Sequence, residues 1–477
     1  MNYRMITYVL GWILVFEALF MAVPIITALV YAEHIIWSYA GCAAICAAAG
    51  GLLIMKKPQK TSLYSREGEV IVALSWVALS LFGALPLWIS GEIPSFVDAL
   101  FETVSGFTTT GASILSDVEA LSMASRMWRS FSHWVGGMGV LVFIMAFLPL
   151  SGARNMHIMK AESPGPSVSK LVPRVKTTAL LLYSIYFVLT LAEFVLLLCG
   201  GMTVFEALNT AFSTAGTGGF SIYNSGLSGF SPYIQIVVTV FMLLCSVNFT
   251  CFFFIIAGRI REAFNTEVRT FLIIVACASL IIAVNISGLY SSFGEAFRNS
   301  IFTVASLIST TGFATADYNL WPELSRTLIV LVMFIGACAG STGGGFKVSR
   351  LVILVKSMAK ELQTMVHPRQ VKKIKIDSQP IEHEVVRAVN VYMVAYLLIF
   401  VASITVISFD NHDLITNFTA VLTAMNNVGP GLNLVGPMEN FGFFSDTSKV
   451  VLIFDMLAGR LELFPMLLLF TPATWKK

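Results

Sequence analysis

The hydrophobic pattern of this chain is a series of long apolar runs separated by short polar segments. Each run is roughly 20 residues long, which is the length an α-helix needs to cross about 30 Å of hydrocarbon. The runs begin near residues 6, 34, 69, 130, 176, 232, 268, 325, 387 and 447. The pattern therefore predicts ten membrane-spanning helices. We interpret the first run, 6–30, as a retained helix because it is long, contains Glu17 and lacks the small-residue cleavage pattern of a signal peptide.

Four shorter apolar stretches lie between these runs, and each ends in a polar turn that contains glycine. The stretches start at Ser95, Thr203, Phe293 and Leu414. Each is about 12 to 15 residues long, which is too short to span a bilayer and typical of a re-entrant helix. Irregular backbone at membrane depth is tolerated only beside protein or water. We therefore expect the turns to line water or one another.

The four turns provide the chemistry of a cation filter. A helix C-terminus carries partial negative charge, and a ring of backbone carbonyls can replace the hydration shell of an alkali cation. For one turn alone, close packing of small residues is the simpler explanation, but four turns in register favour a pore. The turns lack the Gly-Tyr-Gly extension of tetrameric potassium channels, so we expect fewer stacked sites and looser discrimination. The candidate filter residues, with potassium as the bound ion, are Thr109, Thr110, Gly111, Thr217, Gly218, Gly219, Thr310, Thr311, Gly312, Asn427, Val428 and Gly429. The turn at 217–219 has two adjacent glycines and leaves open which of them lines the filter.

The spacing of the turns divides the chain into repeats, as expected when a single chain builds a pseudo-symmetric pore. The predicted fold is all-α, with ten transmembrane helices and four re-entrant pore helices around a central pore. Two N-terminal helices, 1–60, lie outside the pore. The four span, pore loop, span repeats are 61–152, 153–258, 259–358 and 359–477.

Composition and charge agree with a membrane protein. Hydrophobic residues make up 56% of the chain, charged residues only 12%, and the mean hydropathy is +0.80. Most of the 30 Lys and Arg residues fall in segments that alternate to one side, which predicts that both termini are cytoplasmic. Many acids fall on the other side, where they would attract cations. These acids include Glu92, Asp98, Glu102, Asp117, Glu119, Asp317, Asp410, Asp413 and Asp446. The sequence has no signature of nucleic-acid binding.

One predicted span is interrupted by glycines. A glycine costs a helix about 1 kcal/mol, so we expect the span to be broken at 336–347, and only in the third repeat. A flexible loop beneath a symmetric filter is a natural gate, whereas a nucleotide P-loop is a poor alternative because Phe346 separates Gly345 from Lys347 and no strand precedes it. The candidate gate residues are Gly336, Gly340, Gly343, Gly344, Gly345 and Lys347.

The last span carries Asp455, Arg460 and Glu462 within eight residues. An arginine at membrane depth is costly unless it faces a cavity or a counter-charge. Two roles remain open for Arg460: an electrostatic barrier in the ion path, or a structural salt bridge to Asp455 or another acid. We expect it to lie below the filter, near the glycine loop.

An ordered set of motifs gives the chain a family resemblance. The motifs are Thr108-Thr-Thr-Gly-Ala, His133-Trp-Val-Gly-Gly-Met-Gly, Ser309-Thr-Thr-Gly-Phe, Gly340-Ser-Thr-Gly-Gly-Gly-Phe-Lys-Val-Ser-Arg and Asn426-Asn-Val-Gly-Pro-Gly. The chain resembles the Trk/Ktr/HKT superfamily of potassium transporters, and most closely its TrkH-type membrane subunit, because two extra helices precede residue 60. The resemblance implies potassium uptake across the inner membrane by a homodimer with one pore per subunit. It further implies a gating loop in the third repeat, Arg460 as the barrier, no organic cofactor, and a separate cytosolic nucleotide-binding ring of the TrkA type.

Three alternatives stay open at this point. A potassium symporter coupled to sodium or protons is the nearest, since Glu17 and Glu193 lie at membrane depth. A membrane-embedded enzyme acting on lipid-linked substrates is remote, because the histidines are spread over both faces without metal spacing, and we expect no enzymatic activity. A passive scaffold for a cytosolic partner would explain the basic loops but not the four turns.

Overall fold

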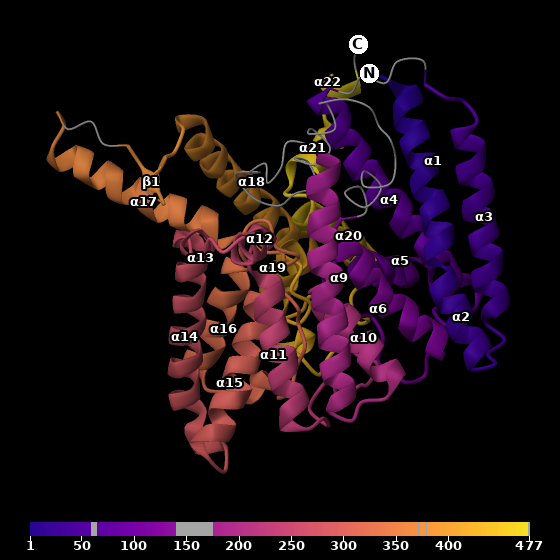
Figure 1. The fold of residues 1–477 in the computed structure, drawn as a ribbon, viewed down its shortest axis with the longest axis horizontal. Coiled ribbons are helices and arrows are strands. Elements are labelled where there is room, and N and C mark those ends of the chain that lie inside the picture. Colours follow the sequence, from indigo (N-terminus) through magenta and orange to yellow (C-terminus); the bar gives the residue numbers. More distant parts are fainter. Residues whose placement is uncertain (59–63, 140–174, 370–372, 378, 476–477) are drawn as a thin grey trace.

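The computed structural model describes residues 1–58, 64–139, 175–369, 373–377 and 379–475 (Figure 1). Nearly all of the described chain is helical. Its β-structure is one short antiparallel hairpin, β1 (Lys375–Ile376) and β2 (Gln379–Pro380), in which Lys375 pairs with Pro380. The expected boundaries at 60/61 and 152/153, the basic segment 154–174 and the terminal lysines lie outside the described residues, so the repeat boundaries remain predictions.

The N-terminal helices form a layer beside the rest of the molecule. This layer consists of α1 (Tyr3–Phe20), α2 (Ala22–Val30) and α3 (Ile36–Ile54), and Figure 1 shows it next to α4 at one side. Gly11 of α1 and Gly50 of α3 face each other, and a Cβ added to Gly50 would lie 2.6 Å from the Gly11 carbonyl oxygen. Small residues let helix backbones approach in this way within a membrane.

The same order of elements then recurs four times: a long helix, a short helix, and a second longer segment. The first set is α4 (Ser65–Ile89), α5 (Phe96–Phe107) and α6 (Met123–Gly137). The second is α9 (Val175–Cys199), α10 (Val204–Ala215), α11 (Pro232–Ser246), α12 (Phe249–Ile256) and α13 (Ile260–Ala263). The third is α14 (Thr266–Ile286), η2 (Ser287–Leu289), α15 (Phe293–Ile308), η3 (Tyr318–Leu320), α16 (Glu323–Ile335) and α17 (Val348–Val366). The fourth is α18 (His383–Ile407), η4 (Ser408–Asp410), α19 (Leu414–Asn426), η5 (Asn433–Val435), α20 (Asp446–Arg460), α21 (Phe464–Phe470) and α22 (Pro472–Trp475).

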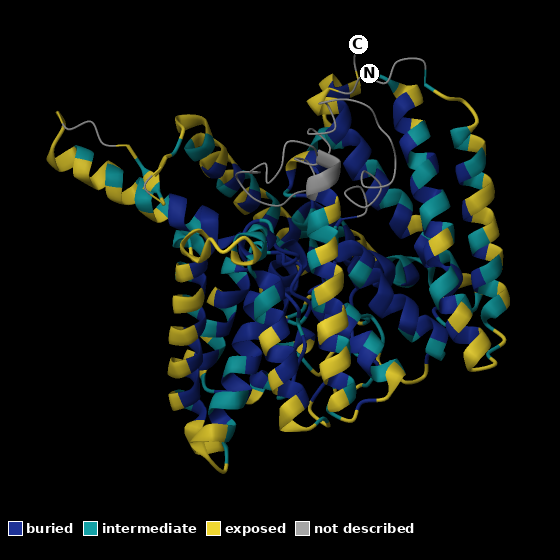
Figure 2. Ribbon diagram, viewed as in Figure 1, coloured by how far each residue is buried: buried dark blue, intermediate teal, exposed yellow. Residues whose placement is uncertain are grey.

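The four short helices α5, α10, α15 and α19 form where re-entrant helices are predicted. They contain 12, 12, 16 and 13 residues. Each starts at a side-chain cap that accepts a hydrogen bond from the backbone N–H three residues later; the caps are Ser95, Thr203, Ser292 and Asp413. These helices lie in the buried centre of the molecule, whereas the peripheral α3, α9 and α14 carry exposed residues (Figure 2). In the part of α9 whose side chains the structure describes, most exposed residues are apolar, among them Phe187, Val188 and Leu191, as expected for a surface in contact with lipid.

Within the described residues, six helical segments are long and apolar enough to cross a membrane. They are Tyr3–Val30, Ile36–Ile54, Ser65–Ile89, Ala179–Cys199, Thr266–Leu289 and His383–Asp410. A seventh consists of α11 and α12 together, which are bent by 94°. Helices α6, α16 and α20 overlap the remaining three expected spans, although α6 begins seven residues earlier than expected, and they contain only 15, 13 and 15 residues. The multi-pass membrane fold is therefore confirmed, while the figure of ten spans stays a prediction.

The expectation of a helix break only in the third repeat is wrong. The third repeat does contain the longest interruption, at 336–347. However, α11 and α12 are also separated by a sharp bend at Val247 and Asn248, and α20 ends before Glu462 and Leu463, which have φ of 56° and 66°. The sequence gives little warning of either break, because no glycine or proline marks these four positions.

Candidate cation site

Each short helix ends in the same hydrogen-bonded turn. In each turn the residue just before the turn glycine donates its N–H to the carbonyl five residues earlier. The residue two positions before the glycine donates its N–H to the carbonyl three residues earlier. This pair of bonds is a Schellman motif. The longer bonds run from Thr110 to Ser105, Gly218 to Ser213, Thr311 to Ser306 and Val428 to Thr423, at 2.8 to 2.9 Å. The four turns are therefore equivalent in backbone structure although their sequences differ.

The left-handed position of this motif is occupied by a residue other than glycine in all four turns. Thr109, Thr217, Thr310 and Asn427 have φ between 52° and 59°. For a β-branched residue this conformation is rare and costs about 1–3 kcal/mol. Strain of this kind, repeated three times with threonine, is typical of functional sites rather than of ordinary helix ends.

The glycine two residues after this left-handed residue shows how the second turn aligns with the other three. Gly111, Gly219, Gly312 and Gly429 all have positive φ, from 75° to 96°. Gly219 is thus the counterpart of the other three turn glycines, while Gly218 corresponds to Thr110, Thr311 and Val428. The sequence left these two glycines undecided.

The four turns meet in a closed ring. A Cβ added to Gly111 would overlap the carbonyl oxygen of Gly218, and one on Gly219 would overlap that of Thr311. The same relation joins Gly312 to Val428, and Gly429 to Thr110 at 2.6 Å, which returns to the first turn. Each turn glycine therefore packs against the equivalent carbonyl of the next turn, and only a residue without a side chain fits this contact.

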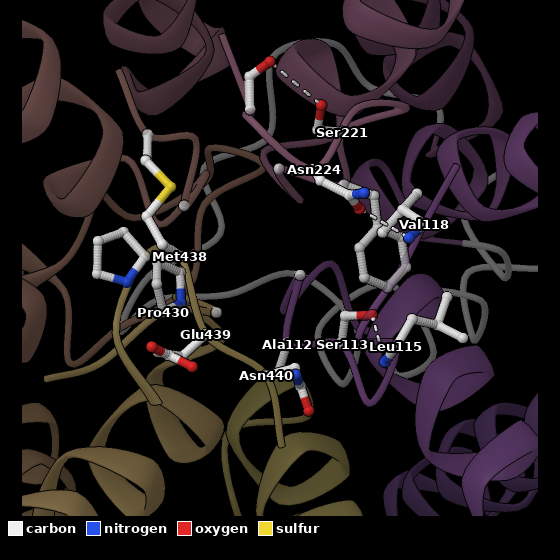
Figure 3. A pocket seen from close by; sticks show the side chains of 18 of the residues that line it. Ala112, Ser113, Leu115, Val118, Ser221, Asn224, Pro430, Met438, Glu439 and Asn440 are labelled. Carbon is white, nitrogen blue, oxygen red and sulfur yellow. Dashed lines mark hydrogen bonds between the residues drawn. The ribbon is translucent and has the colours of Figure 1, made fainter. Parts of the chain in front are cut away.

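A pocket of about 150 Å³ opens above this ring and is lined by all four turn glycines (Figure 3). The segments that follow the turns form its wall, and Figure 3 shows Ser113, Asn224, Glu439 and Asn440 around it. Within the described residues, no group of three or more His, Cys, Asp and Glu side chains is placed to hold a metal ion. A cation in this pocket would therefore be coordinated mainly by backbone and single side-chain oxygens.

An acid that stays ionised, Asp117, lies between the pocket-lining residues Ser116 and Val118. The Asn224 side chain donates to Asp117 Oδ1 at 2.7 Å, and its own carbonyl accepts from Val118 N at 2.8 Å. The Asn224 amide and the Glu119 N–H hold the pKa of Asp117 below its usual value. A negative charge consequently remains beside the pocket throughout the neutral and mildly acidic range.

Glu102 does not act as a free outer acid, contrary to the expectation from sequence. It is buried on α5 and forms an ion pair with Arg129 of α6, with 2.7 Å between Arg129 Nε and Glu102 Oε1. Arg129 also donates to the Ser221 carbonyl at 3.2 Å and lies 4.0 Å from the centre of the Phe220 ring. The pair therefore ties the first turn to the second instead of attracting ions, and the sequence offered no signal for it.

His133 makes a second link between the same two turns. Its Nδ1 lies 2.7 Å from the Gly106 carbonyl oxygen, and Phe220 N donates to its Nε2 at 3.2 Å. The Gly106 carbonyl can only accept, so Nδ1 carries a proton; Nε2 accepts from Phe220 N and carries none, so the imidazole is neutral. A Cβ on Gly218 would collide with this ring.

The glycine loop lies on the helix side of the ring, where it contacts the ends of α15 and α19. It leaves α16 at Gly336 and folds back so that a Cβ on Gly336 would lie 2.6 Å from the Gly345 Cα. Gly344 N donates to Thr310 Oγ1 at 2.6 Å. Lys347 is buried, and its Nζ donates to the Gly343 carbonyl. All six candidate gate residues thus belong to one loop in contact with the turns.

Arg460 lies next to this loop, as expected from the sequence. Its guanidinium donates to the Thr342 carbonyl at 2.8 Å, and to the carbonyls of Gly136 and Gly137 at the end of α6, the latter at 2.8 Å. Asp455 accepts from Ser403 Oγ at 2.8 Å. The arginine therefore connects the last repeat with the first and the third.

Four short helices that converge on one polar ring inside a multi-pass membrane protein define the class of pore-loop transport proteins. The chain belongs to the TrkH family, since the family model described as "Cation transport protein" matches residues 38–477. This family consists of transport proteins, so the alternative of a membrane-embedded enzyme is excluded.

Individual relatives cover the whole chain. It is 35% identical to the Trk system potassium uptake protein TrkH of Escherichia coli strain K12 over 100% of both chains. It is 32% identical to the Trk system potassium uptake protein TrkG of the same strain over 99% of each. The crystal structure of the potassium transporter TrkH from Vibrio parahaemolyticus matches with a TM-score of 0.90 and 34% identity over 100% of both chains.

Proposed function

We propose that this chain takes up potassium through a filter formed by its four turns. The observation that carries the proposal is the closed ring, in which each turn glycine packs against the equivalent carbonyl of the next turn. Relatives of full length are named potassium uptake proteins, which supports potassium as the ion.

The geometry suits a dehydrated alkali cation. Four helices direct their C-terminal ends, and so their negative dipole ends, at one ring. Their turns supply carbonyl oxygens from equivalent positions, namely Thr110, Gly218, Thr311 and Val428, and the neighbouring residues of each turn complete the proposed filter. Contacts between turns fix the ring: Asn427 Nδ2 donates to Thr110 Oγ1 at 2.9 Å. With single short turns instead of extended loops, we expect fewer stacked sites than in tetrameric potassium channels.

Rubidium flux into liposomes that contain only this chain tests the filter. We expect uptake that potassium inhibits more strongly than sodium does. The variants Gly111→Asp and Gly312→Asp should abolish it, because each places a side chain in a contact without room for a Cβ. Gly288→Asp is the matched control, because Gly288 has open space around it. Normal flux in both filter variants would refute the filter assignment.

We further propose that the loop 336–347 is the gate and Arg460 the barrier to ion flow. The loop contacts the turns on the side opposite the pocket, and Arg460 adds a positive charge beside it. Shortening 336–345 should raise basal flux. Unchanged or lower flux in a protein that still reaches the membrane would count against a gate at this place.

Coupled transport is the second candidate, and one observation favours it. Glu17 of α1 is fully buried, and neither of its carboxylate oxygens has a hydrogen-bond partner among the described residues. A buried acid of this kind could bind and release a proton or pair with sodium. Reversal potentials in asymmetric potassium, sodium and proton gradients decide: a purely potassium-dependent potential supports a channel, and dependence on a second ion supports symport.

Assembly and orientation follow from the same proposal. We place the protein in the inner membrane with both termini in the cytoplasm, as a homodimer that binds a separate nucleotide-binding ring of the TrkA type. The helix α17 and the hairpin project from the body (Figure 1), and α17 exposes Met358, Leu362 and Met365 beside Lys356 and Lys360. Mass measurement of the purified protein in detergent, with and without such a ring, tests both contacts.

A further inference from the structure

We infer that Glu267, at the start of α14, is a positioning residue that holds the glycine loop closed and links it to the cytoplasmic hairpin. The inference rests on the proposed gate. It assigns the control of that gate to contacts behind the loop, on the side away from the four turns.

Glu267 joins the two flanks of the loop. Its Oε1 accepts from Ala339 N at 2.7 Å and from Ser349 N at 3.2 Å. These two N–H groups lie on either side of the glycines that contact the turns. One half-buried carboxylate oxygen thus holds both flanks of the proposed gate together, and hydrogen bonds to a charged acceptor are about twice as strong as neutral ones.

The bend between α11 and α12 forms the other half of the support. Because the helix turns by 94° here, backbone groups that a straight helix would pair internally are available to the loop. Cys338 N donates to the Ser246 carbonyl at 3.1 Å, and Phe249 N donates to the Gly340 carbonyl at 3.0 Å. Thr342 Oγ1 adds a bond of 3.1 Å to the Cys245 carbonyl.

The same support reaches the cytoplasmic side. Asp377, in the turn of the hairpin, accepts from Thr266 N at 2.7 Å and from Thr266 Oγ1 at 2.6 Å. Thr266 immediately precedes Glu267 in the chain. The hairpin is also bonded to α17, since Lys356 Nζ donates to the Lys375 carbonyl at 2.7 Å. Figure 1 shows α13, the start of α14 and α17 side by side at this junction. Movement of the hairpin would therefore pull on both flanks of the loop.

The first test compares two variants at this position. Glu267→Ala removes both bonds and should raise basal rubidium flux about tenfold, the effect of losing one or two partly buried hydrogen bonds. Glu267→Gln keeps a neutral oxygen acceptor and should raise it less. Glu262→Ala is the matched control. Glu262 is an exposed acid that lies five residues before Glu267 in the chain and forms its ion pair with Arg259. Two results would overturn the inference. Glu267→Ala could show the same flux as the parent, or Glu267→Gln could show a flux as high as that of Glu267→Ala.

The second test reads the loop directly. Cys338 is buried in the loop. In a protein in which Cys338 is the only cysteine kept, N-ethylmaleimide should label it at least several-fold faster in Glu267→Ala than in the parent. Thr342→Val, a nearly isosteric change, removes a different hydrogen bond of the same support and should speed labelling to a smaller degree. It provides an independent test in case Glu267→Ala does not fold. Equal labelling rates in all three proteins would contradict the inference.

A double-mutant cycle tests the link to the hairpin. If Asp377 acts through Glu267, the effects of Asp377→Ala and Glu267→Ala on basal flux will be less than multiplicative. Strictly multiplicative effects would exclude the link. Failure of this inference can be told apart from failure of the proposed gate. If shortening 336–345 raises flux but Glu267→Ala does not, the gate stands and only the role of Glu267 is refuted.

Discussion

The hydroxyl oxygen of Thr310 lies 2.6 Å from the backbone nitrogen of Gly344 and accepts its hydrogen bond. Thr310 is the residue with positive φ in the third turn, and Gly344 belongs to the glycine loop. The proposed filter and the proposed gate are therefore joined by a single bond to a strained residue. Among the described residues, the other three turns have no hydrogen bond to the loop. The third turn is therefore the one whose strained residue is bonded directly to the proposed gate.

Removing the Thr310 hydroxyl should loosen the proposed gate. Thr310→Val keeps the shape of the side chain but leaves a buried N–H without a partner, at a cost of about 1–3 kcal/mol to the closed loop. We expect basal rubidium flux to rise about tenfold, measured as initial rate in liposomes. Thr217→Val makes the same change in the second turn, where the hydroxyl donates to the neighbouring Gly216 carbonyl. An equal rise in both variants would show that the effect comes from the turns and not from the loop contact.

The ring contact predicts an unusual sensitivity to one methyl group. Gly219→Ala would push a Cβ into the Thr311 carbonyl oxygen and also strain a backbone with φ of 75°. Overpacking costs about 1–3 kcal/mol, and in this variant it destabilises the contact between two turns of the ring. We expect uptake to drop at least about tenfold.

The control for this variant is Gly229→Ala, in the segment between α10 and α11, because nothing lies within 4 Å of the added methyl group. Surface expression is measured alongside uptake for both. Full activity of Gly219→Ala would mean that the turns are not packed against one another as the ring requires.

The features that could be predicted from the sequence are local. Helix lengths, side-chain caps and glycine turns depend on neighbouring residues, so the short helices and their turns were located within a residue or two. The partners of Glu102 and His133 lie in other elements of the chain, and no spacing rule relates them. The bend at Val247 was missed for another reason: it is stabilised by the loop that docks on it, which is tertiary structure overriding local propensity.

The ionised Asp117 beside the pocket predicts an effect of charge on uptake that depends on salt. Asp117→Asn removes one negative charge beside the pocket, and we expect the initial rate at low potassium to fall roughly twofold in low salt and less at high ionic strength. Because the pKa of Asp117 is below its usual value, the wild-type residue stays ionised as the pH falls from 8 to 5. The ratio of wild-type to variant rates should therefore be constant over that range.

Flux measured at several pH values and two salt concentrations checks this prediction. A ratio that approaches one at pH 5 would indicate that Asp117 becomes protonated there, against the hydrogen bonds from Asn224 and Glu119 that keep it charged.

At Arg460, the effect of the positive charge of the proposed barrier can be separated from the effect of its hydrogen bonds. Arg460→Gln removes the positive charge, and we expect the rate of rubidium uptake to rise several-fold because the ion no longer passes a like charge. Arg460→Lys keeps the charge, although an ammonium group cannot reproduce the planar donor set that bridges Thr342 and Gly137. The lysine variant should therefore stay near the parent rate while its melting temperature in detergent falls. If lysine raised the rate as much as glutamine, the bridge between the repeats, and not the charge, would be what limits ion flow.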